Sequence, residues 1–314
     1  MLTKGLVTRR ELMIAGGLAA IGTATSGSAS AAQPSSLPWI DAHSHIWRPD
    51  TDVFPLQPGM TAEDLAPKSF TAEELLAVAQ PEGVGRVVLI QHTWFHGFDN
   101  SFLIDAWKQR PEQFRVVGMV DDLRPNAGLA MKQLLQQGVT GFRIVPRKGI
   151  GEWLKTDGMR EMWKTAAETR QPMCCLINPE NLSEVDEACQ SNPDTPVVID
   201  HFARIGIDGQ IREADLNRLC LLAKHRNVKV KISAYYALGK KQPPHHELIP
   251  MIRRLCETFG TRRLMWASDA PYQIDAPNSY AASVALIRDH IDFVTDEERR
   301  QLLRTTAEET FFFC

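Results

Sequence analysis

Short apolar runs alternate with longer amphipathic segments along most of the chain. Eight runs are rich in Val and Ile and lack a regular polar face: residues 40–46, 86–92, 114–120, 139–145, 172–177, 196–201, 228–235 and 264–269. Such continuous apolar runs are typical of parallel strands that are covered on both sides. The pattern therefore predicts an α/β fold built on a parallel sheet.

The segments between these runs carry helical periodicity and end signals. Helices are expected at residues 71–80, 100–110, 126–137, 213–225 and 246–259. Pro111 follows the second of them, and Gly138 and Gly260 follow the third and the fifth, where such residues commonly end helices. Eight strands that alternate with helices over a chain of this length fit a single (β/α)8 TIM-type barrel better than an open sheet.

The N-terminal segment, positions 1–31, does not follow this pattern. Arg9 and Arg10 precede a weakly apolar stretch at residues 13–24, and the sequence ASA at residues 29–31 offers a small-residue cleavage site. These features predict a twin-arginine signal peptide and export to the periplasm. The apolar stretch is shorter than the ~20 residues of a membrane-spanning helix, which disfavours an anchor. The expected plan is a signal peptide at 1–31, a linker at 32–38 and a barrel at 39–314.

The composition of the chain limits which classes of binding partner are expected. Removal of Lys4, Arg9, Arg10 and Glu11 with the signal segment changes the formal net charge from −3 to −5, and no basic stripe is left. We therefore expect a small-molecule substrate, with no nucleic acid and, after signal cleavage, no membrane. Homo-oligomerisation is left open. The six cysteines form no C-x-x-C pair and read as small buried residues, although an oxidising compartment would permit a disulfide.

Ionisable residues gather at the ends of three of the predicted strands. His43 and His45 are two positions apart in the first strand and so face the same side. His201 ends the sixth strand, and Asp269 ends the eighth. Because the active sites of such barrels form at the carboxyl ends of the strands, we expect these four side chains on one concave surface. Burying four such groups lowers stability unless they are partnered, which favours a functional role.

Several segments at these positions resemble known motifs. They are IDAHSHIW at 40–47, GFR at 141–143, VVIDHF at 197–202, VKIS at 230–233 and LMWASDAP at 264–271. Together they resemble the amidohydrolase superfamily, and within it the amidohydrolase-2 branch. Its lactonase-like members include the 2-pyrone-4,6-dicarboxylate lactonase, 4-sulfomuconolactone hydrolase and L-fuconolactonase types. The resemblance covers nearly the whole chain after the signal segment and implies a hydrolase on a (β/α)8 barrel.

The metal content expected from the resemblance is open. Members of the branch that hold a metal firmly also use a histidine from the fifth strand, and residues 172–178 contain none. His43, His45 and Asp269 still provide the three ligands of a catalytic zinc site. Cys174 or Cys175 offers a substitute thiolate, although cysteines within an apolar strand more often pack the core. We therefore expect either no required cofactor or one zinc ion.

The resulting hypothesis is a hydrolase that opens a lactone. Asp269 would act as the general base for water. His43, His45 and His201 would polarise the carbonyl and stabilise the oxyanion, directly or through zinc. Two alternatives remain open: a zinc-dependent decarboxylase or amide hydrolase of the same superfamily, and a noncatalytic periplasmic binding protein on the same scaffold.

Residues near other strand ends are expected to contact the substrate. Arg143, and with it Arg147, would pair with a substrate carboxylate through their forked donors. Smaller contributions are expected from loop residues that follow the second, fifth and seventh strands, namely His92, Asn178 and Tyr235 or its neighbour Tyr236. Each of these assignments depends on which way a loop side chain turns.

Overall fold

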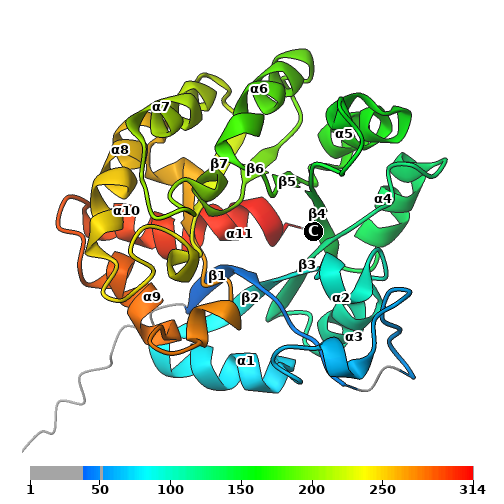
Figure 1. Cartoon of the computed structure of the whole chain (residues 1–314), viewed down its shortest axis with the longest axis horizontal. Coiled ribbons are helices and arrows are strands. Elements are labelled where there is room, and N and C mark those ends of the chain that lie inside the picture. The colour runs from blue at the N-terminus through cyan, green and yellow to red at the C-terminus, as the bar shows by residue number, and fades with distance from the viewer. Residues whose placement is uncertain (1–37, 50–51, 314) are drawn as a thin grey trace, which may run out of the picture. The chain divides into compact units, whose positions relative to one another are not determined.

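The computed structural model describes residues 38–49 and 52–313. Its strands are β1 (Trp39–Ser44), β2 (Val84–Ile90), β3 (Phe114–Gly118), β4 (Val139–Ile144), β5 (Met173–Cys175), β6 (Val197–Ile199), β7 (Val228–Ile232) and β8 (Leu264–Trp266). They pair in parallel in this order, and helices surround them (Figure 1). The prediction of a (β/α)8 barrel is thereby confirmed.

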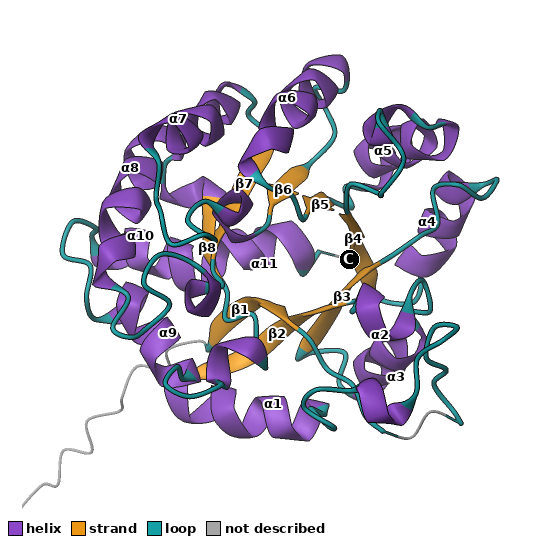
Figure 2. Cartoon of the chain, viewed as in Figure 1, coloured by secondary structure: helices purple, strands orange, loops and turns teal. Residues whose placement is uncertain are grey.

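Helices surround the strands, most of them in a ring, and α11 crosses the middle of the view (Figure 2). They are α1 (Ala72–Ala79), α2 (Thr93–His96), α3 (Ser101–Gln109), α4 (Ala127–Leu135), α5 (Asp157–Thr169), α6 (Leu182–Ser191), α7 (Glu213–Leu221), α8 (Ile249–Phe259), α9 (Tyr280–Arg288), α10 (Asp296–Arg300) and α11 (Thr306–Phe311). The five expected helices are present. Helix α1 begins after Thr71, whose hydroxyl accepts from the Glu74 backbone while the Glu74 carboxylate accepts from the Thr71 N–H. This capping box satisfies two backbone donors of the first turn.

Several strands end earlier than the sequence predicts. β6 ends at Ile199 and β8 at Trp266, so His201 and Asp269 lie in the loops that follow. Both residues have a left-handed backbone, with φ of 53° and 64°. This conformation cannot continue a β ladder, which explains the shorter strands.

The barrel closes where β1 meets the segment after β8. Ser44 and Ala270 form a parallel bridge. The buried carboxylate of Asp41 accepts the backbone N–H of Ser268 at 2.9 Å and the hydroxyl of Tyr280 at 2.8 Å. Asp41 in β1 therefore connects the segment after β8 and α9 to the first strand. Its hydrogen bonds offset part of the cost of burial, which still raises the pKa of Asp41.

Two apolar clusters build the core. The larger one lies between the strands and the surrounding helices. The smaller one contains alternate residues of the strands, such as Ile40, Val88 and Met265, and therefore fills the barrel interior. Phe311 of α11 belongs to this inner cluster, so the last helix covers the amino end of the barrel.

The expectations for the N-terminal region lie outside the described residues. The signal segment at 1–31 and nearly all of the linker at 32–38 therefore stay predictions, as does export. Among the described residues, no helix combines the length and the apolar character needed to cross a membrane. The cysteines at positions 174, 175, 189, 220 and 256 are free thiols.

Candidate active site

Backbone hydrogen bonds bring the first and last motifs together. The Asp269 N–H donates to the His43 carbonyl at 2.8 Å, and the His45 N–H donates to the Ala270 carbonyl at 2.8 Å. These two bonds fix the carboxylate of one motif against the imidazoles of the other. The left-handed backbone of Asp269 then turns the chain out of the strand direction at the rim.

The four predicted residues surround one point. Asp269 Oδ1 lies 3.4 Å from His43 Nε2 and 3.3 Å from His45 Nε2. Its Oδ2 lies 3.7 Å from His201 Nε2 and accepts the hydroxyl of Tyr236 at 2.9 Å. All four predicted side chains are almost fully buried. The structure therefore brings together side chains at and just after the ends of β1, β6 and β8, where the sequence predicts them.

Burial and charge set the protonation of this group. Burial alone would raise the pKa of Asp269, but the adjacent imidazoles outweigh it and hold that pKa well below its usual range. Burial lowers the pKa of His201 to about 4. Burial, together with the cationic Lys231, also lowers the pKa of His43 well below its ordinary value. At neutral pH the site therefore presents an ionised carboxylate beside neutral His43 and His201.

Two buried cations lie directly behind His43. The Arg143 guanidinium, from β4, donates to His43 Nε2 at 2.7 Å and lies 3.3 Å from Asp200 Oδ2. Lys231 Nζ, from β7, lies 3.1 Å from Asp200 Oδ1 and 3.2 Å from His43 Nδ1. Burial opposes ionisation of Asp200, but Lys231 and the neighbouring groups keep its pKa well below the usual range. Asp200 thus neutralises cations that would otherwise be unpaired beneath the site.

The roles of Asp200 and Lys231 were not predicted from the sequence. Asp200 directly precedes His201, and Lys231 lies in the VKIS segment, so both stand inside quoted motifs. A lysine at a fully buried strand position is rare unless it is paired, and this is the signal that could have found it.

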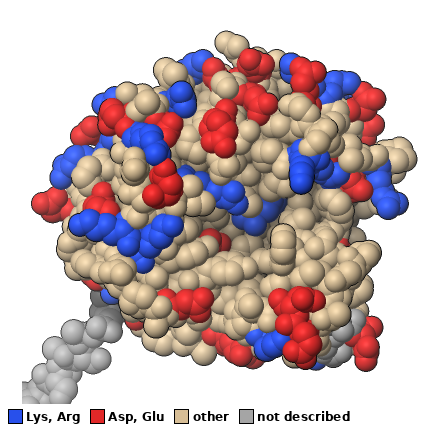
Figure 3. Space-filling view, in the orientation of Figure 1, with Lys and Arg blue, Asp and Glu red and all other residues tan. Residues whose placement is uncertain are grey.

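A hollow of about 500 Å³ opens beside Asp269. Its polar lining comprises His45, His92, Thr93, Arg143, His201, Arg204, Tyr236, Asp269 and Tyr272. Figure 3 shows a hollow near the middle of the face that looks along the barrel, with Lys and Arg atoms in it. The hollow places Asp269 within reach of a small molecule that enters from solvent.

The two arginines expected at the site, Arg143 and Arg147, lie in different places in the structure. Arg143 lines the hollow, whereas Arg147 does not. Arg147 instead lies 2.9 Å from Asp121 Oδ1 and 2.8 Å from Asp122 Oδ1. Its charge is therefore already neutralised by two carboxylates away from the site. Arg204, which was not among the residues predicted from the sequence, occupies the wall of the hollow.

Of the other residues expected to contact the substrate, some line the hollow and others do not. His92 lines the hollow and hydrogen-bonds the hydroxyl of Tyr272. Tyr235 points into the core, where its hydroxyl donates to the Ile232 carbonyl at 3.0 Å, while its neighbour Tyr236 faces Asp269. Asn178 is outside the lining of the hollow and accepts a hydrogen bond from Arg204.

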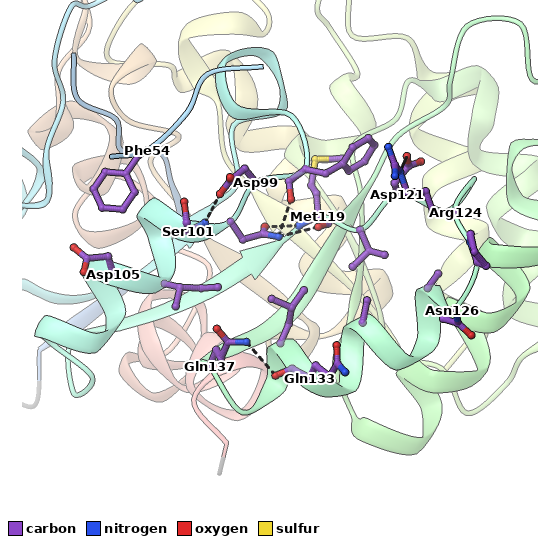
Figure 4. Close-up of a pocket in the computed structure, with 18 of the residues that line it drawn as sticks. Phe54, Asp99, Ser101, Asp105, Met119, Asp121, Arg124, Asn126, Gln133 and Gln137 are labelled. Atoms are coloured by element: carbon purple, nitrogen blue, oxygen red, sulfur yellow. Dashed lines mark hydrogen bonds and ion pairs between the residues drawn. The ribbon is translucent and has the colours of Figure 1, made fainter. Parts of the chain in front are cut away.

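A larger hollow of about 900 Å³ lies between α3 and α4 (Figure 4). None of the predicted site residues lines it, and its lining contains no histidine. Asn100, at its floor, is already bonded to the backbone of Met119 in both directions, at 2.9 and 2.8 Å. Size alone would favour this hollow, but the reactive groups lie in the smaller one.

The donor atoms at the site fit one divalent cation. His45 Nδ1 lies 2.8 Å from the Ile90 carbonyl, which only accepts, so this nitrogen carries the proton. In a neutral ring, Nε2 then directs a lone pair at Asp269 Oδ1, 3.3 Å away, and two such atoms attract a cation between them. With His43 they form a set of three potential ligands. Arg143 competes, because its hydrogen bond occupies His43 Nε2.

The cysteines of β5 do not extend this ligand set. Burial raises the pKa of Cys174 to about 12 and raises the pKa of Cys175 well above its ordinary value. Each Sγ lies against the backbone carbonyl of the second preceding residue, at 3.8 Å. A thiol in this environment remains protonated, so both cysteines act as core residues.

Two known proteins are similar to this chain in sequence. The chain is 28% identical over 234 residues to 4-sulfomuconolactone hydrolase of Rhizobium radiobacter, covering 74% of this chain and 75% of the relative. It is 26% identical over 235 residues to L-fucono-1,5-lactonase of Burkholderia ambifaria, covering 74% and 80%.

Solved structures show the same fold at lower identity. A candidate 2-pyrone-4,6-dicarboxylic acid hydrolase from Pseudomonas putida superposes with a TM-score of 0.75 at 23% identity, covering 88% of this chain and 98% of that chain. An amidohydrolase from Burkholderia multivorans with bound zinc superposes with a TM-score of 0.70 at 18% identity, covering 88% and 100%. A family model described as amidohydrolase matches residues 40–313, and the chain therefore belongs to the amidohydrolase family.

Proposed function

We propose that this protein is a hydrolase that opens a lactone, with Asp269 as the general base. The observation that carries the proposal is the ionised Asp269 carboxylate, which lies among three imidazoles and lines an open hollow. The sequence relatives named as a lactone hydrolase and a lactonase support the same reaction class.

The reaction follows from the position of Asp269. Its carboxylate accepts a proton from a water molecule as the water oxygen bonds to the lactone carbonyl carbon. When the tetrahedral intermediate collapses, the ring C–O bond breaks and the same proton passes to the departing alkoxide. The product is an open-chain hydroxy acid, and Asp269 returns to its ionised form.

Neighbouring side chains supply stabilisation for the developing oxyanion. The Tyr236 hydroxyl keeps its proton, because burial and the adjacent Asp269 charge raise its pKa. His201 is oriented by a 2.8 Å hydrogen bond between its Nδ1 and Ser233 Oγ, which leaves its Nε2 on the side of Asp269. A His201 Nε2–H that is fixed in this way would stabilise a forming oxyanion without reorganisation, whereas the Tyr236 proton is donated to Asp269.

A metal would assist this chemistry, and its ligands are present. A zinc ion held by His43, His45 and Asp269 would supply Lewis-acid polarisation of the carbonyl. An ester carbonyl is more electrophilic than an amide carbonyl, and an alkoxide leaves more readily than an amine. Lactone opening therefore demands less of such help than amide hydrolysis, which agrees with a ligand set smaller than that of firmly metallated relatives.

A screen of lactones tests the proposal. Sugar lactones and carboxylated lactones are incubated with the purified protein at constant pH, with and without added zinc, and acid release is titrated. We expect at least one lactone to be opened, and the Asp269→Asn variant to release no acid above background. Release of CO2 from an aromatic acid, with no lactone opened, would favour the decarboxylase alternative. Ligand binding unchanged by Asp269→Asn, with no turnover of any lactone, would favour the binding-protein alternative.

We propose further that the mature enzyme acts in the periplasm, on the basis of the N-terminal sequence alone. The full chain would be expressed in a Gram-negative host with and without Arg9→Lys and Arg10→Lys. We expect the unaltered chain to be recovered from the periplasm without residues 1–31, and the double variant to remain uncleaved in the cytoplasm. Equal recovery of both proteins would contradict export by this route.

A further inference from the structure

We propose that Arg204 binds a carboxylate on the lactone, so that the substrates of this site are anionic lactones. The inference rests on the proposed function and extends it to the substrate class. Carboxylate binding is thereby assigned to Arg204, which lies outside the recognised motifs, and is no longer assigned to Arg147.

The backbone places Arg204 beside His201. Residues His201, Phe202, Ala203 and Arg204 form a left-handed turn with φ of 53°, 54°, 53° and 57°. In a helix with three residues per turn, the first and fourth side chains lie on the same side. His201 and Arg204 both line the hollow, whereas Phe202 and Ala203 are fully buried. The turn therefore joins a reacting imidazole and a guanidinium into one wall.

Backbone hydrogen bonds hold this turn. The Ala203 N–H donates to the Asp200 carbonyl at 3.0 Å, and the Ile207 N–H donates to the Arg204 carbonyl at 3.1 Å. Four successive L-residues in this conformation are disfavoured. Such backbone persists where the surrounding structure enforces it, and it concentrates at ligand-binding sites.

Arg204 differs from the other cations of the site in its partners. Among the described residues, no carboxylate oxygen lies within ion-pair distance of its guanidinium, and its hydrogen bond is to the neutral Asn178 Oδ1 at 3.3 Å. Arg143 is paired with Asp200, and Arg147 with Asp121 and its neighbour. Within the part of the chain that the structure describes, the hollow thus contains a half-buried guanidinium that makes no ion-pair contact with a carboxylate.

An incoming carboxylate would complete this arrangement. Burial and the nearby Arg143 charge lower the pKa of Arg204, so its charge is unfavourable in the empty hollow. An anion relieves both effects, and a guanidinium fork binds a carboxylate with two parallel hydrogen bonds. The lactone carbonyl would then lie toward His201 and Asp269, on the neighbouring wall.

Matched substrates and variants test the assignment. The probes are a five-membered lactone with a carboxymethyl substituent and the primary amide of the same lactone. We expect the wild type to prefer the acid, and Arg204→Met to lower kcat/KM for the acid by about 10- to 100-fold, mainly through KM. The loss with the amide should be much smaller. Arg204→Lys should fall between, because it keeps the charge without the fork. Arg226→Met, which removes an exposed arginine paired with Asp194, is the control.

The outcomes separate this inference from the proposed function. A wild type that opens acid and amide equally would overturn the inference and leave lactone opening intact. Equal losses by Arg204→Met on both probes would do the same, since they would indicate a structural role. A wild type that opens neither probe would count against both proposals. Thermal unfolding of each variant shows whether its fold is retained, and the wild-type preference decides the question if Arg204→Met does not fold.

Discussion

The two ends of the barrel differ in how some of their arginines are paired. At the amino end, Glu308 of α11 accepts from Arg86 at 2.6 Å and from Arg304 at 2.9 Å, which ties the last helix to β2. At the carboxyl end, the cations Arg143 and Lys231 lie beside one another, and Arg204 has no carboxylate partner among the described residues. At the amino end, Arg86 and Arg304 therefore share one carboxylate, whereas at the carboxyl end the Arg204 guanidinium is left for a ligand.

The two ends of the barrel also differ in which residues adopt a left-handed backbone. Loops that enter β2, β4 and β8 use Gly83, Gly138 and Gly260 at left-handed positions, although Arg170 does so before β5. Loops at the carboxyl end also contain glycines with positive φ, such as Gly206 and Gly239. Beside the hollow, however, the turn at 201–204, Ala234 and Asp269 adopt left-handed backbone without being glycine. Glycine adopts this conformation without steric cost, whereas the other residues require support from packing. Strained non-glycine backbone is thus found where side chains are directed into the hollow.

The largest expected effect separates activity from stability at the carboxyl end. Asp269→Asn removes the proton acceptor, so we expect lactone opening to fall by about 10³-fold. The amide still accepts from Tyr236, and the free energy of unfolding should change by no more than about 1 kcal/mol. Turnover and urea unfolding are measured on the same preparation. A large loss of stability would show that the Asp269 carboxylate is itself needed for folding, so that the loss of turnover could not be assigned to the missing proton acceptor.

The next effect tests the buried charges behind His43. Asp200→Asn would leave Arg143 and Lys231 without their shared anion, and we expect a loss of about 3–5 kcal/mol in the free energy of unfolding. Urea denaturation monitored by tryptophan fluorescence measures this loss. Asp194→Asn, which removes an exposed partner of Arg226, is the matched control and should change stability by less than about 1 kcal/mol. Equal effects would contradict the assigned network.

A smaller effect concerns metal binding. Arg143 donates to His43 Nε2, so Arg143→Met would free a ligand atom and remove a nearby positive charge. We expect zinc affinity to rise about tenfold, equivalent to ~1.4 kcal/mol, even though activity falls. Competition with a chromophoric chelator gives the affinity without an activity assay. Unchanged or weaker zinc binding would mean that Arg143 does not compete for the site.

The smallest effect lies at the amino end. Hydrogen bonds from Arg304, and then from Arg86, lower the pKa of Glu308 from its ordinary value of 4.5. Its stabilising contribution is therefore complete above about pH 4.5 and fades as the pH falls through the folded-state value. Because the side chain is about one-third exposed, Glu308→Gln should lower the free energy of unfolding by only about 0.5–1 kcal/mol at pH 7. The difference from wild type should shrink in acid, and a pH-independent difference would refute the ion-pair explanation.

Much of the cluster around Asp269 could be predicted because it depends on local sequence and strand order. The parity of His43 and His45 follows from the alternation of side chains along a strand. His201 and Asp269 end apolar runs, and a barrel brings all such ends to one rim. Neither conclusion needs the direction of any loop side chain.

The residues that were misplaced or missed beside the hollow lie beyond the last ladder pairs. Tyr235 and Tyr236 are equivalent in the sequence, and only the left-handed Ala234 before them determines which one meets Asp269. Arg147 was expected in the site because it follows a strand, but Asp121 and its neighbour hold it elsewhere. Arg204 was missed because an extended chain would not place it beside His201.

The sequence by itself determined the barrel, the order of its strands and the gathering of imidazoles and one carboxylate at the rim, because hydrophobic periodicity and strand parity act over a few neighbouring positions. The tertiary structure alone decided which charges are neutralised, which loop side chains enter the hollow and which cation is left for a ligand. Those outcomes depend on left-handed turns and on partners from other loops, such as Asp121 for Arg147, and no local pattern encodes them.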